Sequence, residues 1–172
     1  MSEADVLARR VADTMLSREG TGPAWGLVIE DAREGYARVS MRIRDDMLNG
    51  HRVLHGGLTF SLADTAFAYA CNSRNEVAVA HAASISFLGM AKTGDTLIAE
   101  AVETAQAGKS GVYMVSVRRR MADPSQNSWA IPAPWEAPLY KCLQFLENNS
   151  LTDWSINCKI RTSEKPTCTR PI

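Results

Sequence analysis

The fold is decided by residues 58–73, which read LTFSLADTAFAYACNS. In this stretch, apolar or small side chains occupy nearly every position around a helical wheel, and Asp64 is the only charged residue. A helix that is apolar nearly all round is buried inside a domain. We therefore predict one long helix at the centre of the fold.

Strand-like patterns lie on both sides of this helix. Residues 36–43 alternate strictly between apolar and polar side chains, as in a strand with one buried face. Turn-forming residues at 31–35 join this strand to the apolar run 25–30 and predict a hairpin. An amphipathic helix is predicted at residues 3–17. Three more strand-like runs follow the central helix, at residues 77–88, 96–105 and 111–117. This order predicts an α+β fold in which an antiparallel sheet wraps around one long central helix.

The composition and charge are those of one globular domain. Of 172 residues, 45% are apolar and 22% are charged, which excludes a collagen-like, coiled-coil or wholly disordered chain. Nineteen basic residues balance nineteen acidic ones, so we expect no nucleic-acid partner. No uncharged apolar run is long enough for a membrane span, and the N-terminus is acidic. We expect a cytoplasmic protein with no membrane partner.

The four cysteines give no sign of a metal site. None belongs to a C-x-x-C pair or has a histidine at zinc-finger spacing. We therefore expect free thiols, no metal and no cofactor.

The amino-acid usage changes near residue 121. All eleven glycines lie at or before Gly111, whereas six of the seven prolines and three of the four tryptophans lie after residue 121. We therefore divide the chain into a domain at residues 1–120 and an atypical, Pro- and Trp-containing, Gly-free tail at residues 121–172. Our hypothesis is that the tail derives from a shifted reading frame, a mispredicted gene end or an unrelated fusion.

Asp64 stands out because its carboxylate lies among the apolar residues of the predicted central helix. Burying an ionised carboxylate has a desolvation cost unless a partner compensates it. One alternative is structural, in which Asp64 pairs with an arginine or caps a neighbouring loop. The other is chemical and depends on His55-Gly56-Gly57 at the start of the helix. Glycines there let a ligand approach unpaired backbone N–H groups, which favour the oxyanion of an ester or thioester carbonyl.

Helix geometry adds a demand on the chemical alternative. Gly56 and Asp64 are eight residues apart, so on one helix about 12 Å of rise separates them. One carbonyl group cannot lie within hydrogen-bond reach, about 3 Å, of both. If both residues act on one substrate, they come from different subunits, which predicts an obligate dimer with two equivalent sites.

A family resemblance lies in residues 49–68, which read NGHRVLHGGLTFSLADTAFA. This stretch resembles the signature of the hotdog-fold acyl-CoA thioesterases, and within them the phenylacetate-degradation (PaaI-type) branch. The likeness covers residues 10–118 and includes further matches at residues 70–73, 85–88, 94–97 and 108–113. The fold of that family is the sheet-around-helix plan reached above, so the resemblance implies a hotdog thioesterase domain.

The resemblance implies roles for individual residues of this stretch. Asp64 would be the catalytic carboxylate, acting as general base on water or as nucleophile. The backbone N–H of Gly56 would form the oxyanion hole, with Gly57 beside it. Asn49 would help to position the thioester or the water, and His55 would line the site.

The resemblance also implies a substrate and an assembly. Members of the family hydrolyse aryl- or acyl-CoA thioesters without a metal, so the expected partner is an acyl-CoA such as phenylacetyl-CoA or hydroxyphenylacetyl-CoA. They act as homodimers, usually paired into homotetramers. Phe60, Phe67 and Phe87 are candidates for an apolar acyl pocket, although packing into the core explains each of them at least as well.

Two other functions remain open at this point. A hotdog-fold acyl dehydratase needs a catalytic histidine poised against a carboxylate of the partner subunit, and His55 precedes the helix. The spacing from Gly56 and Gly57 to Asp64 fits hydrolysis better. A non-catalytic acyl-CoA-binding module is the second alternative, and the unusual tail favours it.

The resemblance leaves one gap in the sheet. After Val117 the family continues with a short turn and a final strand that completes the sheet, and the tail offers no convincing candidate for that strand. A missing strand would expose an unpaired edge on its neighbour, with a loss of stability and activity.

Overall fold

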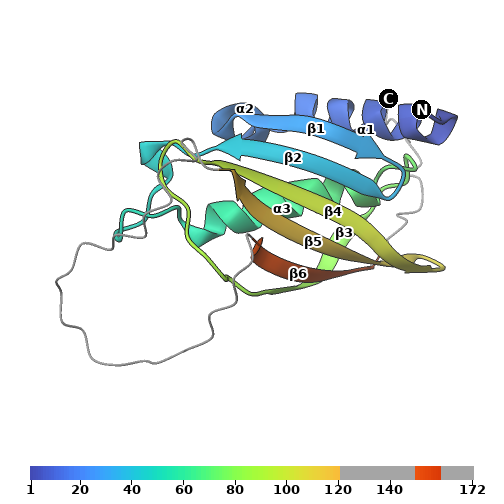
Figure 1. Cartoon of the computed structure of the whole chain (residues 1–172). Helices are drawn as coiled ribbons and strands as arrows, with labels where there is room; N and C mark the ends of the chain where they lie inside the picture. Colours follow the sequence, from blue (N-terminus) through green and yellow to red (C-terminus); the bar gives the residue numbers. More distant parts are fainter. Residues whose placement is uncertain (121–149, 160–172) are drawn as a thin grey trace, which may run out of the picture.

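The computed structural model describes residues 1–120 and 150–159. Its helices, including the short 3-10 helix η1, and its strands are shown in Figure 1. In chain order they are α1 (Glu3–Arg18), α2 (Thr21–Trp25), β1 (Leu27–Arg33), β2 (Tyr36–Arg42), η1 (Asp45–Met47), α3 (Gly56–Cys71), β3 (Val79–Ile85), β4 (Thr96–Ala107), β5 (Ser110–Arg120) and β6 (Ser150–Lys159). None of the described helices is both long enough and apolar enough to cross a membrane.

The strands form one antiparallel sheet in the order β1-β2-β4-β5-β6-β3. The sheet curves around α3, and α1 packs along β1 (Figure 1). The predicted α+β plan, with an antiparallel sheet around one long central helix, is therefore confirmed.

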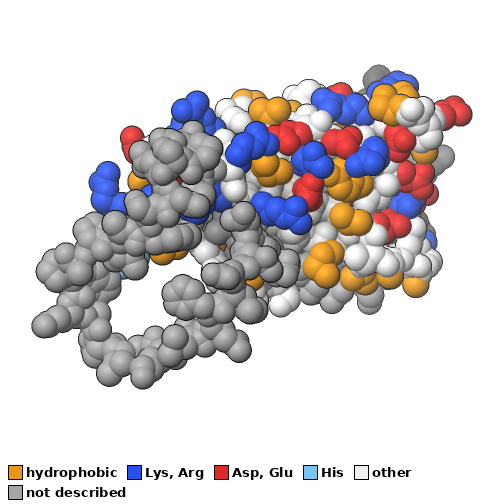
Figure 2. Space-filling view, in the orientation of Figure 1, with side chains coloured by type: hydrophobic (Ala, Val, Ile, Leu, Met, Phe, Trp, Pro, Cys, Tyr) orange, Lys and Arg blue, Asp and Glu red, His pale blue; other side chains and the backbone are white. Residues whose placement is uncertain are grey.

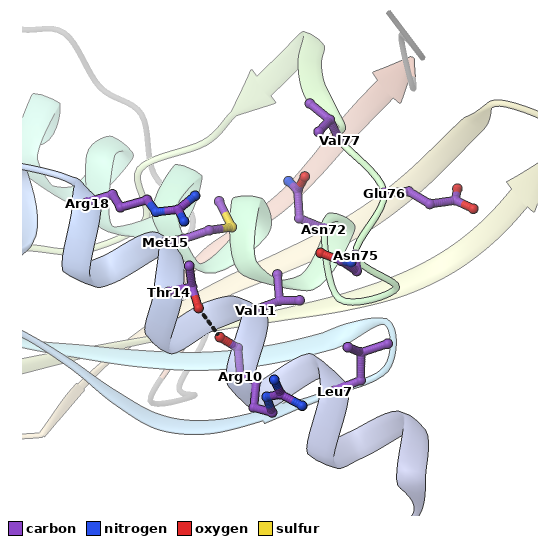
Figure 3. A pocket seen from close by; sticks show the side chains of 10 residues that line it. All are labelled: Leu7, Arg10, Val11, Thr14, Met15, Arg18, Asn72, Asn75, Glu76 and Val77. Carbon is purple, nitrogen blue, oxygen red and sulfur yellow. Dashed lines mark hydrogen bonds between the residues drawn. The ribbon is translucent and has the colours of Figure 1, made fainter. Parts of the chain in front are cut away.

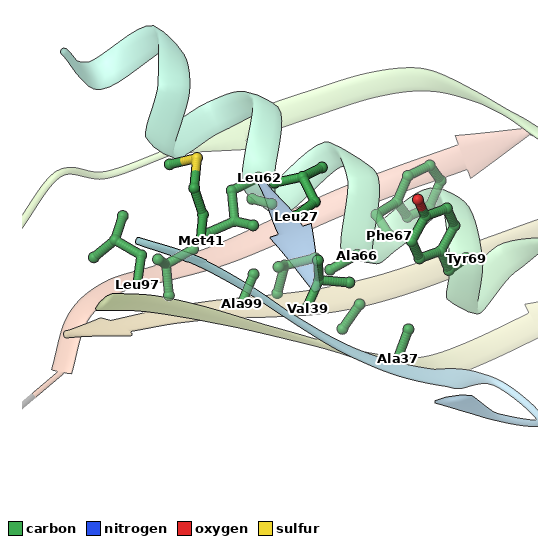
Figure 4. Close-up of a cluster of buried hydrophobic side chains, with 14 of the residues drawn as sticks. Leu27, Ala37, Val39, Met41, Leu62, Ala66, Phe67, Tyr69, Leu97 and Ala99 are labelled. Carbon is green, nitrogen blue, oxygen red and sulfur yellow. The ribbon is translucent and has the colours of Figure 1, made fainter. Parts of the chain in front are cut away.

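The core lies between α3 and the concave face of the sheet (Figure 4). Leu62, Ala66 and Phe67 of α3 belong to one buried cluster with Val39 and Met41 of β2, and none of the five is more than 1% exposed. Small residues such as Ala66 let the helix approach the sheet closely at the packing density of a protein interior. Each large apolar side chain that is fully buried here contributes about 1.5–3 kcal/mol to folding.

Strand β6 fills the place between β5 and β3. The backbone of Trp154 lies opposite Val115 on one side and Ile85 on the other. The expectation that the tail offers no final strand is therefore wrong for residues 150–159. Residues 121–149 and 160–172 lie outside the described part, and the division of the chain after residue 120 stays a prediction.

A polar cluster ties the end of α3 to the sheet. The guanidinium of Arg74 donates two hydrogen bonds to the carboxylate of Glu103, at 2.7 and 3.0 Å, and a third to Glu34 at 2.9 Å. The hydroxyl of Tyr113 donates to the same Glu103 carboxylate at 2.6 Å. These contacts, led by the hydrogen bond from Arg74, lower the pKa of Glu103. The cluster therefore stabilises the charged form of Glu103.

Glu103→Gln is expected to lower the free energy of unfolding by about 1–3 kcal/mol at pH 7, because Arg74 loses one of its two charged partners and keeps only Glu34. The pKa of Glu103 is lower in the folded state. Its contribution is therefore present above the unfolded value of 4.5 and is lost as the pH falls through the folded value. Urea unfolding of both proteins between pH 7 and pH 3 measures the difference, which shrinks on acidification. The control is Asp13→Asn, which breaks the exposed Arg9–Asp13 pair. Equal losses in the two variants would contradict the prediction.

Candidate active site

The start of α3 presents an open backbone donor. His55 is the N-cap, and its Nδ1 accepts a hydrogen bond from the N–H of Gly57 at 3.0 Å. The N–H groups of Leu58 and Thr59 both donate to the carbonyl of His55. The N–H of Gly56 has no acceptor among the described residues. A helix N-terminus carries partial positive charge, so this N–H suits an anion or a developing oxyanion.

Asn49 lies in the loop before α3, opposite Val53. Leu48 and Leu54 form an isolated antiparallel bridge, so residues 49–53 turn back on themselves. The side-chain oxygen of Asn49 accepts hydrogen bonds from the N–H groups of His51, at 2.9 Å, and Val53, at 3.4 Å. The side-chain NH2 group of Asn49 donates no hydrogen bond to a described residue, whereas its backbone N–H donates to the carbonyl of Val53 at 2.8 Å. His55, Gly56 and Gly57 thus lie together at the start of α3, and Asn49 lies in the loop that leads into it.

Asp64 lies in the middle of α3 and is half-buried. Its neighbours Leu62, Ala63 and Ala66 are fully buried. No described residue forms a hydrogen bond or ion pair with its carboxylate. Burial alone raises the pKa of Asp64. The alternative in which Asp64 pairs with an arginine or caps a loop is therefore wrong for the described part of the chain.

The two candidate groups do not meet within one protomer. Gly56 and Asp64 both belong to α3, which is continuous from Gly56 to Cys71. The helix rise therefore keeps them about 12 Å apart along the axis. In the described ranges, no three His, Cys, Asp or Glu side chains are grouped so that they could hold a metal ion.

The predicted pocket phenylalanines occupy three different environments. Phe67 is 1% exposed and packs edge-to-face against Tyr113, with ring centroids 5.3 Å apart, so it lies in the core and away from the helix start. Phe60 is partly buried against the core. Phe87 is 54% exposed, and its ring lies on Gly56. A role for Phe60 and Phe67 in substrate binding stays a prediction.

The sequence analysis names Phe87 as a candidate for the acyl pocket, but it did not indicate the direct contacts of residues 86–91 with Gly56 and with the loop before α3. The N–H of Leu54 donates to the carbonyl of Ala91 at 2.9 Å, and Phe87 covers Gly56. Both contacts join residues more than thirty positions apart. Neither has a local pattern, so only the three-dimensional structure could identify them.

A surface cavity lies elsewhere, between α1 and the loop that connects α3 to β3 (Figure 3). Its volume is about 320 Å³. None of the residues predicted to form the site lines it. The cavity is lined by Leu7, Arg10, Val11, Thr14, Met15, Arg18, Asn72, Asn75, Glu76 and Val77. The candidate active site at the start of α3 therefore lies apart from this cavity.

Comparisons with known proteins agree on one family. The model of the thioesterase superfamily matches residues 51–121. The acyl-coenzyme A thioesterase PaaI of Escherichia coli K12 is 46% identical over 106 residues, which are 62% of this chain and 76% of that protein. A putative esterase of Archaeoglobus fulgidus is 38% identical over 112 residues, 65% of this chain and 73% of its own length. The solved structure of E. coli PaaI, from the phenylacetic acid degradation operon, superposes with a TM-score of 0.74. It has 31% identity and covers 92% of this chain and 96% of its own.

His55→Ala is expected to lower the free energy of unfolding by about 0.5–2 kcal/mol, because the N–H of Gly57 loses its capping acceptor. His55→Asn is the matched control, since an asparagine side chain caps a helix in the same way and should retain most of the stability. Urea unfolding of the three proteins measures the effect. A loss of equal size in both variants would show that His55 does not act as the cap.

Proposed function

The chain belongs to the thioesterase superfamily and is a thioester hydrolase, and on that premise we propose that it hydrolyses acyl-CoA thioesters. We further propose a preference for aryl-acyl groups such as phenylacetyl or hydroxyphenylacetyl. The observation that carries the proposal is the pair of unsatisfied groups on α3. One is the Gly56 N–H at the helix start, and the other is the half-buried Asp64 carboxylate, without a partner among the described residues.

In the proposed reaction, the carbonyl oxygen of the thioester accepts a hydrogen bond from the N–H of Gly56. Asp64 takes a proton from a water molecule, whose oxygen attacks the carbonyl carbon. The negative charge that develops on the carbonyl oxygen is stabilised by Gly56 and the helix dipole. The C–S bond then breaks, and the thiolate of coenzyme A leaves and takes up the proton. Alternatively, Asp64 attacks the carbonyl carbon itself, the C–S bond breaks as the thiolate of coenzyme A leaves, and water then hydrolyses the resulting anhydride to the free acid and the Asp64 carboxylate.

Two further residues support this reaction. The side-chain NH2 group of Asn49, which donates to no described residue, is available to hydrogen-bond the water or the thioester oxygen. His55 holds the first turn of α3 through Gly57, which leaves the Gly56 N–H as the open donor. His55 therefore acts here as a positioning residue.

The proposal requires a two-fold dimer. Because Gly56 and Asp64 of one α3 cannot reach one carbonyl, the Asp64 of the partner must complete each site. Strand β3 supports this arrangement. It lies at an edge of the sheet, is paired only with β6 in the described chain, and has exposed side chains along nearly its whole length. Edge-to-edge pairing of β3 with a second copy would satisfy that edge. Further pairing of dimers into a tetramer stays a prediction.

The aryl preference has support from the relatives and from the site. The E. coli relative is the acyl-coenzyme A thioesterase PaaI, a protein from the phenylacetic acid degradation operon. In this chain, Phe87 places an aromatic ring beside the proposed oxyanion site. Acyl-CoA is the proposed partner, and the cytoplasm remains the proposed location.

Asp64→Asn is expected to lower kcat on phenylacetyl-CoA by about 10²–10⁴-fold, because an amide cannot accept the proton of water. The variant should be no less stable than the wild type. The raised pKa of Asp64 means that folding disfavours its charged form, so the wild type loses stability as the pH rises through that pKa and Asp64→Asn does not. Thiol release from pH 4 to pH 8, with urea unfolding over the same range, measures both effects. In the pH profile of kcat, activity is lost on the acid side as Asp64 takes up a proton. The midpoint of that loss should lie above pH 3.8, the usual pKa of aspartic acid. Undiminished turnover in Asp64→Asn would overturn the assignment.

Gly56→Pro tests the oxyanion donor, because it removes the N–H while keeping a residue that suits the first position of a helix. The extended backbone of His55, with ψ of 127°, is compatible with a following proline. We expect kcat to fall by about 10²–10³-fold. Gly56→Ala is the matched control, since it adds a Cβ but keeps the N–H. Comparable losses in Gly56→Pro and Gly56→Ala would show that the N–H is not the active group.

Mixing the two inactive variants tests the shared site. In a dimer of one Asp64→Asn subunit and one Gly56→Pro subunit, one of the two shared sites has both native groups and the other has neither. Random reassortment should therefore recover about one quarter of wild-type activity. If each site lay within one subunit, mixing would recover none.

A further inference from the structure

We infer that Phe87 is the specificity-determining residue for the acyl group, an inference that rests on the proposed function. The ring of Phe87 forms a wall beside the proposed oxyanion site and favours an aryl group next to the thioester carbonyl. An aromatic ring at this position would favour aryl-acyl thioesters over short alkyl-acyl thioesters, because only the aryl group is large enough to contact it.

The first observation is the contact between Phe87 and Gly56. A Cβ placed on Gly56 would lie 3.2 Å from two ring carbons of Phe87, Cε1 and Cζ. The ring therefore packs directly on the Cα of Gly56, and only a glycine allows it to approach so closely. Because the Gly56 N–H is the proposed oxyanion donor, a carbonyl bound there lies beside this ring.

The second observation is that the segment carrying Phe87 is anchored at its C-terminal end, at Met90 and Ala91. The N–H of Leu54 donates to the carbonyl of Ala91 at 2.9 Å, and Ala91 is 5% exposed. The guanidinium of Arg119 donates to the carbonyl of Met90 at 3.2 Å and lies 3.7 Å from the carboxylate of Asp95. These contacts hold Met90 against β5 and Ala91 against the loop that leads into α3. The ring is therefore positioned before the substrate arrives, which reduces the entropy lost on binding.

The third observation is the exposure of apolar side chains in this segment. Phe87 is 54% exposed, Leu88 is 62% exposed and Met90 is 53% exposed. Several large apolar side chains exposed within four residues and next to an open donor are typical of a binding surface. An aryl ring separated from the carbonyl by one methylene, as in phenylacetyl, would reach the Phe87 ring. Aromatic rings favour offset-stacked or edge-to-face contacts with each other.

Phe87→Ala is expected to lower kcat/KM for phenylacetyl-CoA by about tenfold, mainly through a higher KM, because a hydrophobic contact to the acyl group is lost. For acetyl-CoA, whose acyl group does not reach the ring, the change should stay within about twofold. Phe87→Tyr keeps the ring and should keep the ratio of the two substrates. The control is Val28→Ala in β1, since Val28 is 56% exposed and far from the site in sequence and sheet order.

A double-mutant cycle tests the contact itself. Gly56→Ala forces the ring of Phe87 to move by a few tenths of an ångström, so it should reduce the preference for phenylacetyl-CoA. In the Phe87→Ala background the added methyl group meets no ring, so Gly56→Ala should have no further effect on that preference. Additive effects of the two substitutions would overturn the contact as the origin of specificity.

The outcomes separate the two proposals. If the wild type releases no thiol from any acyl-CoA, the proposed function fails. If the wild type is active and Phe87→Ala keeps the wild-type ratio of phenylacetyl-CoA to acetyl-CoA, only the role of Phe87 fails. Urea unfolding of each variant checks that a change in KM does not come from a loss of folded protein.

Discussion

The rigidity of α3 is the constraint on which the rest of the molecule depends. The helix is continuous from Gly56 to Cys71, and the sheet packs around it, so the distance between Gly56 and Asp64 is fixed by the helix rise. Two chemical groups that suit one reaction are thereby held too far apart to perform it in one protomer. The second subunit that the proposed reaction requires is thus a consequence of helix geometry. The exposed edge at β3 supplies a surface on which such a subunit can pair.

The same helix combines a stabilising and a destabilising element. Its apolar face contributes to folding through Leu62, Ala66 and Phe67, whereas Asp64 opposes folding at neutral pH because its charge is partly desolvated and unpaired in the described chain. An arginine beside Asp64 would remove that cost and would also lower the pKa of the carboxylate, which makes it a weaker base. A half-buried carboxylate without a counter-charge is thus less stable and more reactive for the same physical reason.

Much of the fold could be predicted from the sequence because its signals are local. Residues 58–73 are apolar around the whole helical wheel, and residues 36–43 alternate, so the central helix and the antiparallel sheet follow from periodicity. Strand β6 could not be placed in the same way. Trp154, Ile156 and Cys158 alternate with polar residues, but residues 121–149, whose composition differs from that of the domain, separate them in sequence from β5. Their position between β5 and β3 depends on long-range pairing.

The candidate site likewise has one part that is local in sequence and one part that depends on tertiary contacts. Asp64 is positioned by its own helix, so its partial burial follows from the apolar residues around it in sequence, whereas its lack of a partner among the described residues is seen only in the structure. The Gly56 end is built from distant parts of the chain: Met47 accepts a hydrogen bond from the His55 N–H, Ala91 accepts one from Leu54, and Phe87 packs on Gly56. None of these partners is adjacent in sequence, and none has a spacing that a pattern could detect. The proposed catalytic base is therefore a local property of α3, whereas the proposed oxyanion site and its aromatic wall are products of tertiary packing. Changes in residues 86–91 should accordingly act on acyl recognition while the base remains intact.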